Sequence, residues 1–144
     1  MIPFIHPQED TPQQALKAIQ DDFDLFPDWA ERYEYLIDLG QKLPIFPDSY
    51  KTDNYRIFGC QSQVWILHDN VGGRLFFLGT SDSSIVAGLI ALLLRIFSGR
   101  TPQEILSVPL SFTQDLGLLN ALSSTRGNGL MEMIKYIQKL AEHS

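Results

Sequence analysis

The sequence contains a single cysteine among its 144 residues, and this scarcity excludes several kinds of protein. One thiol cannot form an intramolecular disulfide, and it cannot supply the several thiolates of an iron-sulfur cluster or a thiolate-rich zinc site. The fold must therefore be stable without cross-links. Any chemistry that needs a thiol must depend on Cys60.

Long apolar runs are also missing. The most apolar run extends over ten residues from Ile85 to Leu94, and as a helix it would be about 15 Å long, half of a bilayer core. The start, Met1-Ile2-Pro3-Phe4, leads directly into polar residues and lacks the parts of a secretory signal. These observations predict a cytoplasmic protein with no membrane partner.

Basic residues are fewer than acidic ones, 11 against 17, which gives a formal net charge of -6. The segment from Glu9 to Asp38 holds nine acidic residues against Lys17 and Arg32. A nucleic-acid partner would require clustered Lys and Arg, so none is expected. The acidic segment fits a solvated helix surface, with steering of a basic protein partner as the alternative.

Length and composition predict a single domain over residues 1–144, with residues 1–10 as a loosely ordered N-terminal arm. Hydrophobic residues make up 44% of the chain and charged residues 19%, as in ordinary globular proteins. A chain of this length can bury one core of useful size.

Capping patterns predict several helices. Thr11-Pro12, Asp28 and Thr101-Pro102 each resemble a helix start, and Ser81 to Ser83 offers caps for the apolar run. Gly40 and Gly99 are expected helix ends. The expected helices cover residues 12–26, 29–39, 84–98, 102–108, 111–122 and 130–140.

Strands are expected at residues 55–58, 62–69 and 74–79, with a turn at Asn70-Val71-Gly72-Gly73 between the last two. Cys60 then lies in the link between the first two strands. Helices grouped around a small antiparallel sheet define an α+β fold, in contrast to a doubly wound parallel one.

The neighbours of Cys60 differ from those of a core cysteine. Gly59 permits a strained turn before it, and Gln61, Ser62 and Gln63 follow with polar side chains suited to a loop near solvent. A reactive thiol and a buried, inert one both fit this local sequence.

A hydrolase would need a base beside the thiol, and the three histidines are poor candidates. His6 and His143 lie near the chain ends, and His68 lies on an expected strand. There is also no glycine-rich phosphate loop and no pair of histidines at metal-binding spacing. A sulfur carrier needs less, because thiol and persulfide exchange requires only an accessible thiolate.

Two charged residues close to glycines or caps could support the site. Asp82 is interpreted first as a helix cap. Arg126, in the stretch Ser124-Thr125-Arg126-Gly127-Asn128-Gly129, could hold a loop to carbonyl groups or lower the pKa of a nearby thiol.

Taken together, these residues resemble the SufE family of cysteine desulfuration proteins, including its CsdE-like branch. The resemblance runs from about Trp29 to Ala141. The motifs that carry it, in chain order, are Leu39-Gly40-Gln41-Lys42-Leu43-Pro44, Gly59-Cys60-Gln61-Ser62-Gln63-Val64-Trp65, Thr80-Ser81-Asp82, Gly88-Leu89-Ile90-Ala91-Leu92, Thr101-Pro102-Gln103-Glu104-Ile105 and Ser124-Thr125-Arg126-Gly127-Asn128-Gly129-Leu130.

The resemblance implies a SufE/IscU-like fold and a role as sulfur acceptor. Cys60 would take persulfide sulfur from a pyridoxal-phosphate-dependent cysteine desulfurase of the SufS/CsdA kind, stimulate it, and deliver sulfur to an iron-sulfur scaffold of the SufBCD kind. The pyridoxal phosphate belongs to the desulfurase, so no bound cofactor and no metal are expected here.

The resemblance also implies supporting roles at the site. Gly59, Gln61, Asp82 and Arg126 are the supporting residues, and Trp65 is expected to shape the seat of the loop. In this family the loop keeps its cysteine near an apolar cavity and moves outward on docking. Phe58 departs from the polar or charged residue expected before the glycine.

Two other functions are kept as alternatives. The protein could activate a desulfurase by contact alone or relay sulfur to tRNA thiolation or cofactor synthesis. It could also be an independent thiol enzyme, although the residues favour a sulfur-transfer accessory protein.

Overall fold

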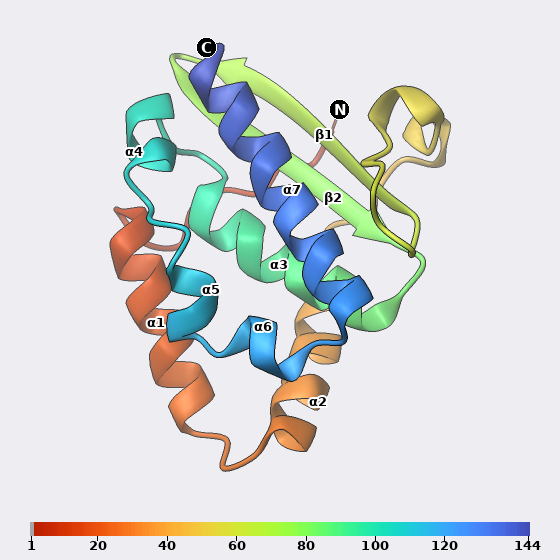
Figure 1. Ribbon diagram of the computed structural model, residues 1–144. Coiled ribbons are helices and arrows are strands. Elements are labelled where there is room, and N and C mark those ends of the chain that lie inside the picture. Colours follow the sequence, from red (N-terminus) through yellow and green to blue (C-terminus); the bar gives the residue numbers. More distant parts are fainter. Residues whose placement is uncertain (1) are drawn as a thin grey trace.

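Seven α-helices and a two-stranded antiparallel sheet form the part of the chain that the computed structural model describes, residues 2–144 (Figure 1). This arrangement confirms the predicted α+β class. The helices are α1 (Pro12–Asp24), α2 (Trp29–Gln41), α3 (Ser84–Phe97), α4 (Pro102–Leu106), α5 (Phe112–Asp115), α6 (Leu118–Ala121) and α7 (Ser124–Glu142).

The sheet is a single hairpin of β1 (Val64–Val71) and β2 (Arg74–Ser81). The pairing runs from Val64 opposite Ser81 to Val71 opposite Arg74. Gly72 and Gly73 both have positive φ, 62° and 83°, as a two-residue hairpin turn requires. The Asn70 side chain accepts a hydrogen bond from the Gly73 N–H at 3.1 Å and closes this turn.

Helix α3 is the centre of the core. It contacts β2, α2, α1 and α7, and most of its side chains are buried. α7 crosses the hairpin and α3 on one side of the molecule (Figure 1). Ser83 caps α3 as expected for this segment, with its Oγ accepting from the Val86 N–H at 3.4 Å. No helix within residues 2–144 combines the length and apolar character needed to cross a membrane.

Helices α2 and α3 approach each other closely through small residues. A Cβ added at Gly88 would lie 2.1 Å from the carbonyl oxygen of Leu36, and one at Gly40 would lie 2.8 Å from the backbone nitrogen of Gly88. The prediction that Gly40 ends its helix was wrong, because α2 continues to Gln41. Gly40 instead allows the two helices to touch.

The expected strand at residues 55–58 does not form. Short 3-10 helices at Asp48–Tyr50 and Asp53–Tyr55 occupy the approach to it. Only an isolated bridge between Arg56 and Trp65 and a hydrogen bond from the Ile57 N–H to the Val64 carbonyl, at 2.9 Å, link it to β1. Gly59, with φ of 92°, then turns the chain away before a ladder can extend.

Two helix boundaries near the C-terminus also differ from the prediction. The helix expected at residues 111–122 is divided into α5 and α6 by Gly117, whose φ is 72°. The last helix begins at Ser124 rather than near Leu130, because Ser123 caps it by accepting from the Arg126 N–H at 3.3 Å. Arg126 therefore lies in the first turn of α7.

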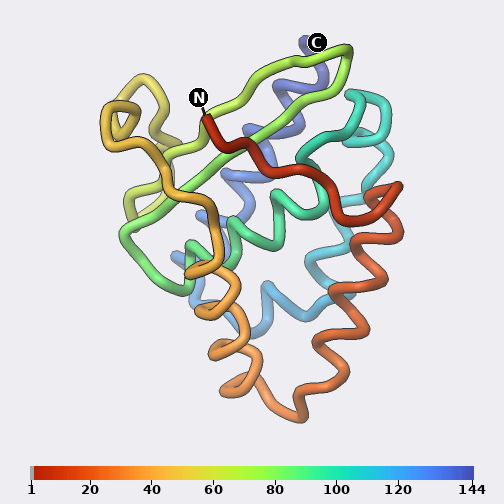
Figure 2. The backbone as a smooth tube through the Cα atoms, turned by 180° about the vertical axis from the view of Figure 1, so that it is seen from behind, coloured from red at the N-terminus to blue at the C-terminus, as the bar shows by residue number. Residues whose placement is uncertain are grey.

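The N-terminal segment crosses the back of the hairpin (Figure 2). We expected a loosely ordered arm; residues 2–10 form no helix or strand, yet they have defined anchors. The Ile5 N–H donates to the Phe77 carbonyl at 2.9 Å, and Ser98 Oγ donates to the Ile5 carbonyl. Glu9 pairs with Arg95 at 2.7 Å. The arm thus covers the edge of β2 opposite β1.

Candidate functional site

Cys60 lies in a loop between the second 3-10 helix and β1, here called the Cys60 loop (residues 58–63). The loop begins at Phe58 and Gly59, where the positive φ favours glycine. A Cβ at Gly59 would meet the Cγ of Glu132 on α7 at 2.9 Å. Glycine thus serves both the turn and the close approach to α7.

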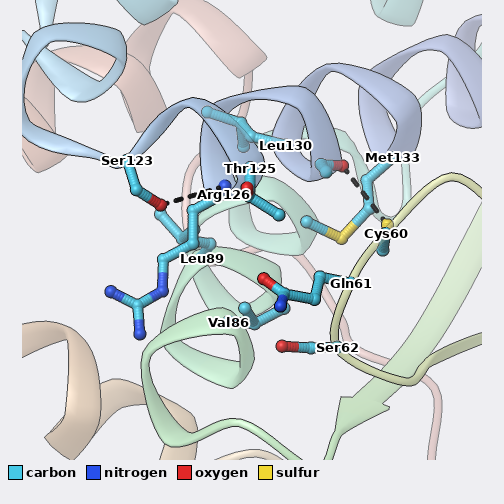
Figure 3. A pocket seen from close by; sticks show the side chains of 11 residues that line it. Cys60, Gln61, Ser62, Val86, Leu89, Ser123, Thr125, Arg126, Leu130 and Met133 are labelled. Carbon is cyan, nitrogen blue, oxygen red and sulfur yellow. Dashed lines mark hydrogen bonds between the residues drawn. The ribbon is translucent and has the colours of Figure 1, made fainter.

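A cavity of about 270 Å³ opens beside the loop (Figure 3). Its walls come from three parts of the chain that are distant in sequence: the Cys60 loop, the start of α3 and the first half of α7. Buried Val86, Leu89, Leu130 and Met133 form its apolar part. Polar side chains, among them Gln61, Ser123 and Arg126, complete the lining, so the only thiol of the protein lies at a cavity of mixed character.

The Cys60 thiol is half-buried and faces the backbone of α7. Its Sγ donates a weak hydrogen bond to the Gly129 carbonyl at 3.6 Å (Figure 3). A Cβ at Gly129 would lie 3.5 Å from Sγ, so the glycine leaves the helix backbone open to the thiol. Because the sulfur is the donor, this hydrogen bond forms only while the thiol is protonated.

Burial raises the pKa of the Cys60 thiol above its ordinary value, and the negative charge of Glu132 raises it further. The positive charge of Arg56 acts in the opposite direction. The position of the loop therefore keeps Cys60 as a thiol near neutral pH. Because the thiolate is the nucleophile, this position also protects the sulfur from oxidation.

Asp82 holds the other end of the loop. Its Oδ1 accepts a hydrogen bond from the Gln63 N–H at 3.0 Å, and its own N–H donates to the Gln63 carbonyl at 3.3 Å. The interpretation of Asp82 as a helix cap was wrong, since Ser83 caps α3. The side chain instead ties the Cys60 loop to the end of β2.

Arg126 lies at the rim of the same cavity, but its guanidinium group points away from Cys60 (Figure 3). The side chain is exposed, and within residues 2–144 the guanidinium has no hydrogen-bond or ion-pair partner. Arg56, rather than Arg126, is the cation that acts on the Cys60 pKa. Arg126 is thus free to contact another molecule at the cavity entrance.

The remaining candidates take different positions. Gln61 is exposed and lines the cavity. Trp65 packs elsewhere, against a small cluster that includes Phe46 and Leu78. Phe58 is 61% exposed, with the Arg56 guanidinium 5.4 Å from its ring centroid.

The histidines do not serve as a base for Cys60, because none of the three lines its cavity. His6 lies beside Phe76, and His68 Nδ1 is 3.4 Å from the Tyr136 hydroxyl. His143 follows α7 at its C-terminal cap. A cysteine hydrolase mechanism has no support from this geometry.

Sequence reasoning missed three residues at the site: Arg56, Glu132 and Met133. Glu132 and Met133 are separated from Cys60 by about seventy positions, and nothing in their local sequence distinguishes them from other members of an amphipathic helix. Arg56 could have been noticed as a cation four residues before the cysteine, although its position depends on the bridge to Trp65.

Comparison with known proteins places this chain in a family. The profile described as "SufE: Fe-S metabolism associated domain" matches residues 17–141. An uncharacterized SufE-like protein of Rhizobium meliloti (strain 1021) is 41% identical over 133 residues, which cover 89% of this chain and 95% of that protein. An uncharacterized SufE-like protein of Rhizobium etli is 38% identical, covering 89% and 90%.

A solved structure shares the fold. The solution structure of a hypothetical protein from Thermus thermophilus matches with a TM-score of 0.73 and 23% identity, covering 90% of this chain and 94% of that one. The profile spans most of the chain and the curated relatives align over nearly their whole length. The chain therefore belongs to the SufE family, whose domain is associated with iron-sulfur metabolism.

Proposed function

We propose that this protein is a sulfur acceptor and carrier that works through Cys60. It takes sulfur from a pyridoxal-phosphate-dependent cysteine desulfurase of the SufS/CsdA kind and delivers it to an iron-sulfur scaffold of the SufBCD kind. The observation that carries the proposal is the position of the only thiol, on a loop at the edge of a cavity with buried apolar residues and a polar rim.

The transfer needs no further catalytic group on this chain. The Cys60 thiolate attacks the outer sulfur of the desulfurase persulfide, a new S–S bond forms at Cys60, and the desulfurase cysteine leaves as a thiolate. No net oxidation occurs, because the sulfane sulfur moves between two equivalent thiols. The absence of a histidine from the Cys60 cavity agrees with this chemistry.

The closed geometry favours transfer only after docking. In the free protein, burial and Glu132 keep the thiol protonated, which opposes reaction with casual oxidants. Outward movement of the Cys60 loop would remove both effects and bring its pKa back toward the ordinary range. After transfer, the buried apolar side chains of the cavity would shelter the persulfide.

In this function the protein itself binds no cofactor. Pyridoxal phosphate would stay with the desulfurase, and this chain would contribute only the thiol and the surface around it. An unpaired cysteine suits the reducing conditions of the cytoplasm, where we place the exchange.

Desulfurase turnover tests the proposal. Wild-type protein should accelerate alanine release from cysteine by a desulfurase in the presence of a weak thiol reductant, and Cys60→Ser should not. If Cys60→Ser stimulates as well as the wild type, the protein is an activator by contact and the carrier function is wrong. Alanine formation by this chain alone would instead indicate an independent enzyme.

A further inference from the structure

A groove of about 210 Å³ lies between the start of the Cys60 loop and α7. One wall is the segment leading into the loop, with Arg56 and Phe58. The opposite wall is the middle of α7, with Glu132, Lys135 and Lys139. We call this the basic groove.

The basic groove carries positive charge in a protein whose net charge is negative. Three cations line it against one carboxylate, whereas the whole chain has a formal charge of -6. Lys135 and Lys139 are exposed and one helical turn apart, so both ammonium groups are on the same face of α7. The basic groove therefore attracts negatively charged groups, although the protein as a whole is acidic.

The three cations of the basic groove are not fully neutralised by carboxylates of the protein itself. Lys135 is 3.8 Å from the Glu132 carboxylate, and within residues 2–144 Lys139 has no ion-pair partner. Arg56 has no ion-pair partner among the same residues, and because its Nε is buried, a docked carboxylate would have to reach the terminal nitrogens of the guanidinium. The Arg56 guanidinium lies over the exposed ring of Phe58, which adds an apolar contact at the groove edge.

The groove is also next to the reacting sulfur along the chain. Phe58 and Gly59 immediately precede Cys60, and Gly59 packs directly on Glu132. A protein that contacts the start of the Cys60 loop therefore has this wall beside it. The groove is too small, and the rest of the surface too acidic, for a nucleic-acid backbone.

We propose that the basic groove is a docking site for an acidic segment, bearing Asp or Glu side chains beside an apolar residue, on the protein that donates sulfur to Cys60. This rests on the proposed function. Carboxylates pair with Lys135, Lys139 and Arg56, and the apolar residue packs on Phe58. Charge complementarity of this kind mainly increases the association rate and selects the partner.

Binding of a cysteine desulfurase to the Cys60→Ser protein tests the groove without sulfur transfer. The double variant Lys135→Glu and Lys139→Glu should weaken binding about tenfold at 0.1 M salt. The difference should shrink near 1 M salt, where the screening length falls to about 3 Å. Lys135→Gln with Lys139→Gln should give an intermediate loss.

The matched control is Lys17→Glu with Lys42→Glu, which makes the same change in net charge at exposed lysines outside the groove. Equal binding losses in the control and the groove variant would overturn the proposal, as would undiminished binding by the groove variant or no binding by the parent protein. Circular dichroism confirms that each variant is folded.

The two proposals fail in different ways. If the groove variant loses binding but wild-type Cys60 never gains sulfur, the docking site stands and the carrier function falls. If Cys60 gains sulfur equally in wild type and groove variant, the carrier function stands and the docking site falls.

Discussion

Glu132 sets the resting state of Cys60 together with burial. Both raise the pKa of the thiol, so at neutral pH only a small share of the protein carries the thiolate. The alkylation rate of wild type should therefore rise with pH through a midpoint above that of an ordinary, exposed cysteine. Glu132, distant in sequence but adjacent in the fold, thus lowers the reactivity of the Cys60 thiol at neutral pH.

Glu132→Gln should lower the Cys60 pKa, because the amide removes the negative charge and leaves the volume nearly unchanged. We expect alkylation by iodoacetamide at pH 7.5 to become about threefold faster, with a lower midpoint. Glu142→Gln, at the exposed end of α7, is the matched control and should leave the rate as in wild type. An unchanged or higher midpoint in Glu132→Gln would contradict this account.

Asp82 restrains the loop through the Gln63 N–H. Asp82→Ala removes the acceptor and should favour the open loop by about 1 kcal/mol. Cys60 alkylation should then become roughly fivefold faster. Asp82→Asn retains an acceptor oxygen and should stay close to wild type; equal rates in the alanine and asparagine variants would show that this hydrogen bond does not hold the loop.

Helices α2 and α3 depend on the missing side chain at Gly88. Gly88→Ala should destabilise the protein by about 3 kcal/mol in urea unfolding, because the new methyl group would overlap the Leu36 carbonyl and force the helices apart. Gly127→Ala is the control inside α7, where the nearest atom would be 3.7 Å from the new Cβ. It should be neutral or stabilising by up to about 1 kcal/mol. Equal stabilities of the two variants would refute the close-packing argument.

Most elements could be predicted because their signals are local. The cap and proline patterns at Thr11 and Thr101 and the paired glycines of the hairpin identify α1, α4 and the turn directly. The strand expected at residues 55–58 does not form, because these residues pair with β1 only at the isolated bridge from Arg56 to Trp65 before Gly59 turns the chain away. The early start of α7 was missed because Gly127 and Gly129 resemble a loop, whereas both are buried in a helix.

Site residues could be predicted only where their type or their immediate neighbours in the sequence set them apart. Cys60 is distinguished by being the only cysteine, and Asp82 and Arg126 by their positions close to glycines or helix caps, to which the family resemblance added supporting roles. The Asp82 contact with Gln63 and the Glu132 contact with Gly59 arise from the fold. Contacts between distant segments have no signature in a single sequence.

At the scale of the molecule, the core and the site share one scaffold. The buried α3 supports the hairpin on one side and supplies Val86 and Leu89 to the Cys60 cavity. α7 supplies the other wall, the Gly129 carbonyl and the cations of the basic groove. A rigid framework therefore presents one restrained loop, which suits a protein that hands an atom from one partner to another.

The most direct test of this account is the intact mass of the protein after incubation with cysteine and a pyridoxal-phosphate-dependent cysteine desulfurase, with Cys60→Ser in parallel. The account predicts a gain of about 32 Da, one sulfur atom, on the wild type alone, reversed by a strong thiol reductant. No gain on the wild type, or an equal gain on Cys60→Ser, would contradict the central claim that Cys60 carries sulfur.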